Sequence, residues 1–133
     1  MRSVGVAYVV ACAAALAACG GAGADAPRDA SVEDFCAAKG WMVAEGMDRF
    51  LAAGRPSETE LVGLVHEWGT ELTRVGTPDN MSADARAGFE AFIDRLEGLE
   101  AGDIESGSFN WEDGAWEDDE ETSFAHYVTN TCP

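Results

Sequence analysis

The sequence predicts an all-α fold: a small four-helix antiparallel bundle of up-down-up-down topology, closed by one disulfide. Four stretches place apolar residues three and four positions apart, the spacing that one face of a helix requires. No stretch alternates apolar and polar residues for long enough to form a sheet. The connections that follow the first and second stretches are short, which favours antiparallel neighbours.

The first two helices have clear start and stop signals. Ser31 is a good N-cap for the first helix, and Gly54 ends it. The second helix opens at Ser57 with Glu60 three residues later, which is the pattern of a capping box, and it closes at Gly76. Each helix carries an apolar stripe: Phe35, Met42, Met47, Phe50 and Leu51 in the first, and Leu61, Leu64, Val65, Trp68, Leu72 and Val75 in the second.

The third helix is predicted to begin at Ser82 and to stop at Gly102. Its stripe is the clearest in the chain: Ala85, Phe89, Phe92, Ile93, Leu96 and Leu99. Residues 103–114 are predicted to form a loop, because they combine acids with serine and glycine. A fourth helix is predicted over residues 116–131, with Phe124, Tyr127 and Val128 on its apolar face.

The first 18 residues have the features of an export signal. Arg2 gives a positive start, and residues 4–16 form an apolar stretch that is too short to span a bilayer as a permanent helix. The stretch ends in Leu16-Ala17-Ala18-Cys19, a branched apolar residue, two small residues and a cysteine. This tetrapeptide resembles the lipobox of bacterial lipoproteins.

The resemblance implies a location and a processing step, and it implies no activity. In lipoproteins the cysteine is joined to diacylglycerol and a dedicated signal peptidase cuts just before it, here between Ala18 and Cys19. Residues 9–12 (VVAC) also fit the pattern, but they would leave only residues 4–11 as the apolar region, so Cys19 is favoured. The Ala-rich composition resembles that of small helical actinobacterial lipoproteins. We therefore expect a lipid anchor on the extracytoplasmic face of the cell membrane.

Three segments follow from this interpretation: a signal peptide (1–18), a lipidated flexible tether (19–30) and an acidic helical domain (31–133). The tether consists mostly of glycine and alanine, and when extended it would reach about 35–40 Å. In the predicted topology, Cys36 at the start of the first helix and Cys132 after the fourth lie at the same end of the bundle. An even cysteine pair in an exported domain predicts a disulfide there. Two buried free thiols are the alternative.

The charge excludes one class of partner. Of eight Lys and Arg, seven remain after the signal, against twenty-five Asp and Glu, so the mature chain carries a net charge of −18. Nucleic acid is not an expected partner, because its phosphates require a basic face. A basic protein or a divalent cation is compatible with this charge. The alternative is that the acidity only maintains solubility.

No catalytic motif is complete, and we expect no enzyme activity, no cofactor and no metal site. His66-Glu67 matches the start of a zinc-protease HExxH helix, but Thr70 stands where the second histidine is needed. His66 is therefore expected at the surface or at its boundary. His126 has no spaced partner, and no nucleophile elbow, P-loop or dinucleotide fingerprint is present.

One acidic, aromatic segment is the candidate interaction site: Phe109, Trp111, Glu112, Asp113, Trp116, Glu117, Asp118, Asp119 and Glu120. Rings supply contact area and charge selects a basic partner, which favours a docking surface. A calcium site is a weaker interpretation, because Phe109 and Trp111 would occupy ligand positions of the EF-hand pattern. A purely structural role is the third: the rings cap the bundle, and the acids stabilise the N-terminus of the fourth helix.

The sequence thus predicts a membrane-anchored, non-catalytic envelope component that acts through its acidic aromatic end. The alternative is a lipoprotein that weakly binds a divalent cation or an apolar ligand. For the apolar ligand, a pocket could form from Trp41, Met42, Met47, Phe50 and Trp68, although residues at such spacing more often form a core.

Overall fold

A computed structural model describes residues 21–105 and 119–133 of the chain. Within these ranges it contains one 3₁₀ helix and five α-helices, and no strand: η1 (Ala22–Asp25), α1 (Val32–Ala53), α2 (Glu58–Val75), α3 (Ala83–Glu97), α4 (Ala101–Glu105) and α5 (Asp119–Thr131). The prediction of an all-α fold with four main helices is confirmed. No helix in the described ranges is both long and apolar enough to cross a membrane.

The helices begin where the local sequence supplies caps. The hydroxyls of Ser31, Ser57 and Ser82 each accept a hydrogen bond from the backbone N–H three residues later, which satisfies one of the unpaired donors of the first turn. The capping box of α2 is complete, because the Glu60 carboxylate also accepts from the Ser57 backbone N–H at 2.8 Å. That hydrogen bond lowers the pKa of Glu60.

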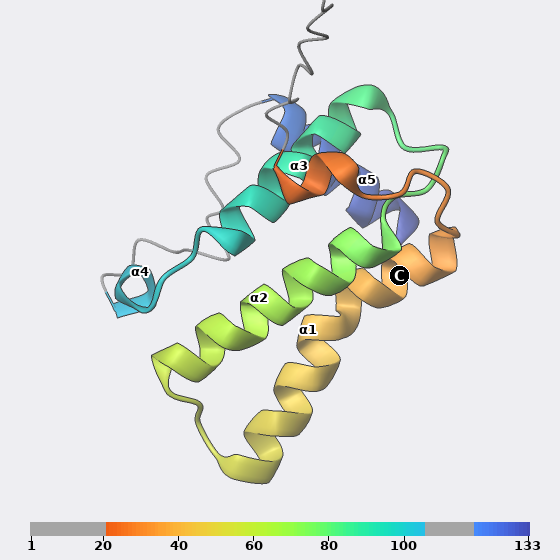
Figure 1. Cartoon of the computed structure of the whole chain (residues 1–133). Helices are drawn as coiled ribbons and strands as arrows, with labels where there is room; N and C mark the ends of the chain where they lie inside the picture. The colour runs from red at the N-terminus through yellow and green to blue at the C-terminus, as the bar shows by residue number, and fades with distance from the viewer. Residues whose placement is uncertain (1–20, 106–118) are drawn as a thin grey trace, which may run out of the picture.

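The main helices form two pairs that lie against each other (Figure 1). α1 and α2 run side by side and are joined by the turn around Gly54, whereas α3 packs closely on α5. Gly88 of α3 allows this close approach, since a Cβ atom there would lie 2.2 Å from the carbonyl oxygen of Glu120. A side chain at position 88 would therefore push the two helices apart.

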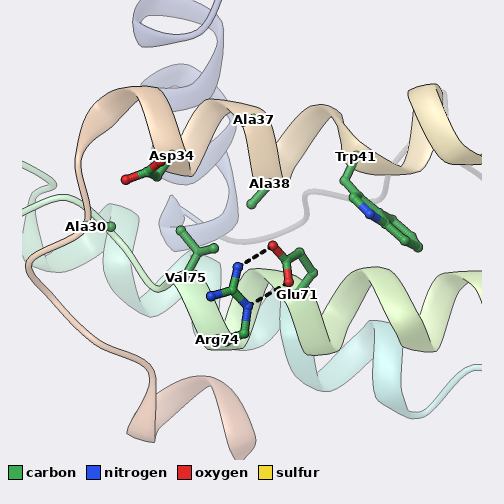
Figure 2. A pocket seen from close by; sticks show the side chains of 8 residues that line it. All are labelled: Ala30, Asp34, Ala37, Ala38, Trp41, Glu71, Arg74 and Val75. Atoms are coloured by element: carbon green, nitrogen blue, oxygen red, sulfur yellow. Dashed lines mark hydrogen bonds and ion pairs between the residues drawn. The ribbon is translucent and has the colours of Figure 1, made fainter.

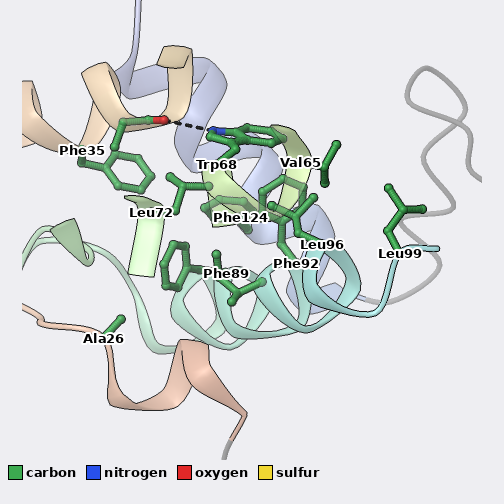
Figure 3. Close-up of a cluster of buried hydrophobic side chains, with 12 residues drawn as sticks. Ala26, Phe35, Val65, Trp68, Leu72, Phe89, Phe92, Leu96, Leu99 and Phe124 are labelled. Atoms are coloured by element: carbon green, nitrogen blue, oxygen red, sulfur yellow. Dashed lines mark hydrogen bonds between the residues drawn. The ribbon is translucent and has the colours of Figure 1, made fainter. Parts of the chain in front are cut away.

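Aromatic side chains fill the core between the two pairs (Figure 3). Phe124 of α5 contacts the rings of Phe35, Phe89 and Phe92, with ring centroids 6.4, 5.8 and 5.6 Å away. Trp68 of α2 is also buried, and its indole N–H donates to the Ala38 carbonyl at 3.0 Å. The hydrogen bond removes the cost of burying the polar edge of that ring.

The predicted disulfide is present. Cys36 in the first turns of α1 is bonded to Cys132 just after α5, with their Cα atoms 5.3 Å apart. The two cysteines are 96 positions apart in the sequence. Close by, the Tyr127 hydroxyl donates to the Asn80 side-chain oxygen at 2.7 Å, so the loop before α3 lies at the same end of the molecule.

The end of the third helix was predicted wrongly. α3 stops at Glu97, with Gly98 as its C-cap, and α4 is a separate short helix within the segment predicted to run from the third helix into a loop. The break allows Leu99 to turn inward, where it is buried and its carbonyl lies 3.0 Å from the Nε2 atom of His66. The fourth helix is described from Asp119 onward, so the predicted start at Trp116 lies outside the described residues.

The segment predicted as a flexible tether also differs from that prediction. From Gly21 onward it is ordered against the domain, and we call residues 21–30 the strap. The strap contains η1, packs along α3, and buries Gly23 and Ala26. Two backbone hydrogen bonds join it to the loop after α2, from Thr77 N–H to Pro27 and from Ala30 N–H to Thr77.

Candidate functional site

Most of the predicted site lies outside the described residues. This holds for the lipidation and cleavage residues Ala18 and Cys19, and for most of the candidate interaction segment: Phe109, Trp111, Glu112, Asp113, Trp116, Glu117 and Asp118. Asp119 and Glu120 are described, and both are exposed in the first turn of α5. Their position at a helix N-terminus agrees with the stabilising role that negative charge has there.

The next acid, Glu121, points the other way. It is only 4% exposed, and its carboxylate forms an ion pair with Arg95 of α3. The acidic run is therefore divided: Glu121 belongs to the contact between α3 and α5, while Asp119 and Glu120 remain accessible to solvent. An ion pair with one nearly buried partner fixes the start of α5 on α3.

The sequence analysis did not identify one side chain that makes many hydrogen bonds in the structure. Arg86 of α3 is 5% exposed, and its guanidinium lies at the centre of the strap. It donates to the carbonyl oxygens of Gly23, Ala26 and Pro27 at 2.8, 2.9 and 3.1 Å. A guanidinium has a rigid fork of donors, so a single side chain can hold several carbonyls at once.

The same guanidinium also fixes the surroundings of the strap. It donates to the Thr77 hydroxyl at 2.7 Å and to the Glu90 carboxylate at 2.8 Å, and it lies over the ring of Phe89. Gly76 is required beside this cluster, because it has φ +81° and a Cβ atom would lie 2.2 Å from the Pro27 carbonyl oxygen. Strap, loop and α3 are thus held by one buried charge, whose hydrogen-bond partners come from all three of them.

A signal for this arrangement exists in the sequence. Arg86 lies three residues before Phe89 and seven before Ile93, so it falls on the buried stripe of α3. A charged residue on an apolar stripe requires buried polar partners. The local sequence does not show which partners, because the carbonyls that it bonds are 59 to 63 positions away.

A cavity of ≈ 430 Å³ lies between α1 and α2 (Figure 2). Its charged wall is an ion pair in which Arg74 donates twice to Glu71, at 2.6 and 2.8 Å. These hydrogen bonds lower the pKa of Glu71, so the carboxylate stays ionised below its ordinary range. Because the fork of Arg74 is engaged by Glu71, this wall of the cavity has the chemistry of a surface ion pair.

Further from the core, the α1–α2 hairpin carries exposed apolar side chains. We call residues 42–63 the arm. Val43, Phe50 and Leu51 are 69%, 46% and 74% exposed there, and a groove of ≈ 440 Å³ runs beside them, lined by Met42, Val43, Gly46, Phe50, Pro56, Leu61 and Leu64.

The five residues suggested for an apolar-ligand pocket do not form one site. Trp68 is in the core, Trp41 borders the cavity of Figure 2, and Met42 and Phe50 line the groove on the arm, while the side chain of Met47 is outside the described part. They separate because Trp41 and Met42 lie at the edge of the core, where they are only partly buried, whereas Phe50 is exposed further along α1.

The titratable groups near the core have structural partners. The ammonium of Lys39 lies over the rings of Trp68 and Phe92, 5.0 and 5.7 Å from their centroids, and burial lowers its pKa. His66 is partly buried and His126 is exposed. In the described ranges, no three side chains of the metal-binding types come together.

Comparisons of the chain with known protein families, with characterised proteins and with solved structures find no match.

Proposed function

We propose that this protein is a membrane-anchored lipoprotein on the extracytoplasmic face, and that it acts as a non-catalytic interaction component of the cell envelope. The anchor is proposed from the lipobox resemblance of residues 16–19. The observation that carries the location is the Cys36–Cys132 disulfide, because structural disulfides form and persist in oxidising compartments.

The proposed contact surface is the acidic aromatic segment that ends at Glu120. Its support in the structure is the exposure of Asp119 and Glu120, which leaves two negative charges accessible at the start of α5. A basic protein surface complements this charge, and neighbouring aromatic residues supply apolar contact area. Such an association weakens as salt is added, because exposed charges are screened.

The anchor is tested by the substitution Cys19→Ala. The variant cannot accept diacylglycerol, so it carries no lipid and the precursor stays uncleaved at this site. Mass spectrometry of the mature N-terminus checks both points. A wild-type chain that starts at another residue and carries no lipid would disprove the anchor.

The contact surface is tested by neutralising Glu117, Asp118, Asp119 and Glu120 to Gln and Asn. Cross-linking in intact envelopes, followed by identification of the linked proteins, should lose its salt-sensitive products. The matched control neutralises four exposed acids elsewhere, Asp48, Asp79, Glu97 and Glu100, and changes net charge equally. Equal loss in both variants, or loss in neither, would contradict docking through this segment.

The alternative function, binding of an apolar ligand, has one observation in its favour: the groove on the arm is lined mainly by apolar side chains. A titration with a fatty acid or haem, followed by tryptophan fluorescence, distinguishes the two functions, because only ligand binding gives a saturable change. Calcium is titrated in the same way to test the cation-binding form of this alternative.

A further inference from the structure

The strap leaves almost no free chain between the proposed anchor and the folded domain. Gly21 is the first described residue, and a Cβ atom built on it would contact the Asp94 side chain of α3. Gly23 is buried against the same helix, where a Cβ atom would lie 2.9 Å from the Cα atom of Glu90. The strap therefore starts beside the second half of α3 and runs from there to the loop at Thr77.

The bonds that hold the strap are strong enough to keep it in place. Three of its carbonyls accept from the buried Arg86, and a hydrogen bond to a charged group is stronger than one between neutral groups. The backbone pairing of Pro27 and Ala30 with Thr77 adds two further hydrogen bonds. Residues 21–30, which could span some 33–36 Å if extended, are consequently not available as a spacer.

We propose that the domain is seated directly on the membrane surface by the edge that the strap forms with α3. This inference rests on the proposed lipidation of Cys19. Only Gly20 lies between Cys19 and Gly21 in the sequence, so the Cα atoms of Cys19 and Gly21 are at most about 7 Å apart. The glycerol attached to Cys19 is at the headgroup level, and Gly21 and Asp94 must lie close to it.

The seating differs from the arrangement expected for a flexible tether. With a free tether, the domain would stand off the membrane. Instead the membrane-proximal edge is the side of α3 that carries η1, and the turn between α1 and α2 lies at the opposite end of the molecule (Figure 1). α1 has 22 residues, about 33 Å of helix, so the arm projects away from the lipid.

Electrostatic attraction does not hold this edge of the domain at the membrane surface. The edge exposes Asp25 and Asp94, while Glu90 is paired with Arg28 at 3.5 Å. Anionic headgroups repel such an edge, so the acyl chains and the short connection hold it in place. The seating should consequently be seen in vesicles of zwitterionic phosphatidylcholine, and it should not need anionic lipid.

The test uses the full, processed lipoprotein in phosphatidylcholine vesicles, with a fluorescent label on one introduced cysteine. Asp94→Cys places the label beside Gly21, and Ala53→Cys places it at the exposed end of α1. A lipid with brominated acyl chains quenches fluorophores near the bilayer. We expect strong quenching at position 94 and almost none at position 53.

Two variants separate the seating from simple anchoring. A ten-residue Gly-Ser insertion between Gly20 and Gly21 keeps every strap contact but restores a tether, so quenching at position 94 should fall to the level at position 53. Arg86→Lys removes the guanidinium fork that holds the strap. This variant should also reduce the difference in quenching between positions 94 and 53. Unchanged quenching at position 94 in the insertion variant would overturn the proposal.

The mass of the N-terminal peptide is measured on every preparation. It distinguishes a failure of the seating alone from a failure of both the seating and the proposed function. If Cys19 is acylated but labels at 94 and 53 are quenched equally, the direct seating is wrong and the lipoprotein function stands. If Cys19 is not acylated, the proposed function and the seating both fall.

Discussion

The half of the molecule built on α3 and the arm of the α1–α2 hairpin have the same secondary structure but differ in packing. The core lies where α3, α5 and the strap meet the first turns of α1 and the second half of α2. In the arm, by contrast, no described side chain is buried, although Val43, Phe50 and Leu51 are as apolar as many residues of the core. An apolar stripe is buried only where another layer covers it.

The comparison shows which contacts stabilise the fold. Two helices alone shield one side of each stripe, and isolated helices of this length are marginal in water. The arm should therefore open locally at a lower free energy than the rest, while the half built on α3 opens only with global unfolding. Side-chain truncations of equal size in the two regions should then lower the free energy of unfolding by unequal amounts.

The largest effect is expected from removing the disulfide in the double variant Cys36→Ala, Cys132→Ala. The bridge closes a loop of 96 positions, and the loss should be roughly 4–5 kcal/mol in the chain-entropy account, a large part of the total for a domain of this size. Thermal unfolding of the double variant, and of the wild-type protein with and without reductant, measures this loss. Equal melting temperatures, or two free thiols in the native protein, would contradict the bridge.

Phe89→Ala should destabilise the domain by about 3–4 kcal/mol, because the ring is fully buried against Phe124 and truncation leaves a cavity. Urea unfolding followed by tryptophan fluorescence gives the change. A loss below about 1 kcal/mol would mean that α3 and α5 do not pack as described.

Arg86→Ala should cost about 2–3 kcal/mol, because the strap carbonyls and the buried Thr77 hydroxyl lose their donor. Hydrogen exchange should increase at the backbone N–H groups of Thr77 and Ala30, which bond across the strap. As a control, Arg55→Ala removes an exposed arginine and should leave both measurements unchanged. Protection that persists in the Arg86 variant would show that backbone packing alone holds the strap.

The smallest effect is expected for Phe50→Ala in the arm. The side chain has the same size as Phe89 but is 46% exposed, so its truncation should cost no more than about 1 kcal/mol. Urea unfolding under the conditions used for Phe89→Ala makes the two values comparable. A loss as large as that of Phe89→Ala would show that the arm is covered in solution, and would remove the contrast between the two regions.

The features that the local sequence predicts correctly are those with short-range causes. Ser57 and Glu60 form a capping box from residues three positions apart, and Gly54 and Gly76 adopt the positive φ that ends their helices. Phe89, Phe92 and Leu96 fall on one face because a helix repeats every 3.6 residues. The predicted export makes a disulfide between Cys36 and Cys132 the expected pairing, and the bundle topology brings the two together.

Only part of the candidate site could be predicted from the local sequence. The anchoring residues and the aromatic part of the interaction segment stay predictions, since they lie outside the described residues. Within the described part, the sequence treats the acids at 119–121 as one run, but the packing of α5 on α3 turns Glu121 inward to Arg95. Which acids are accessible depends on a neighbour that is 26 positions away.

The cysteine pairing follows from the predicted export and from the predicted topology. Helix starts, the apolar stripes and the proposed anchor residue follow from neighbouring residues, because caps, helical period and the lipobox are local patterns. The strap and the break before Leu99 do not. Residues 21–27 have the composition of a flexible linker, and they become ordered because Arg86, some sixty positions later, satisfies their carbonyls. Likewise, Leu99 leaves the helical path because α2 offers it a buried position. Both are long-range contacts, and only the assembled core brings their partners together.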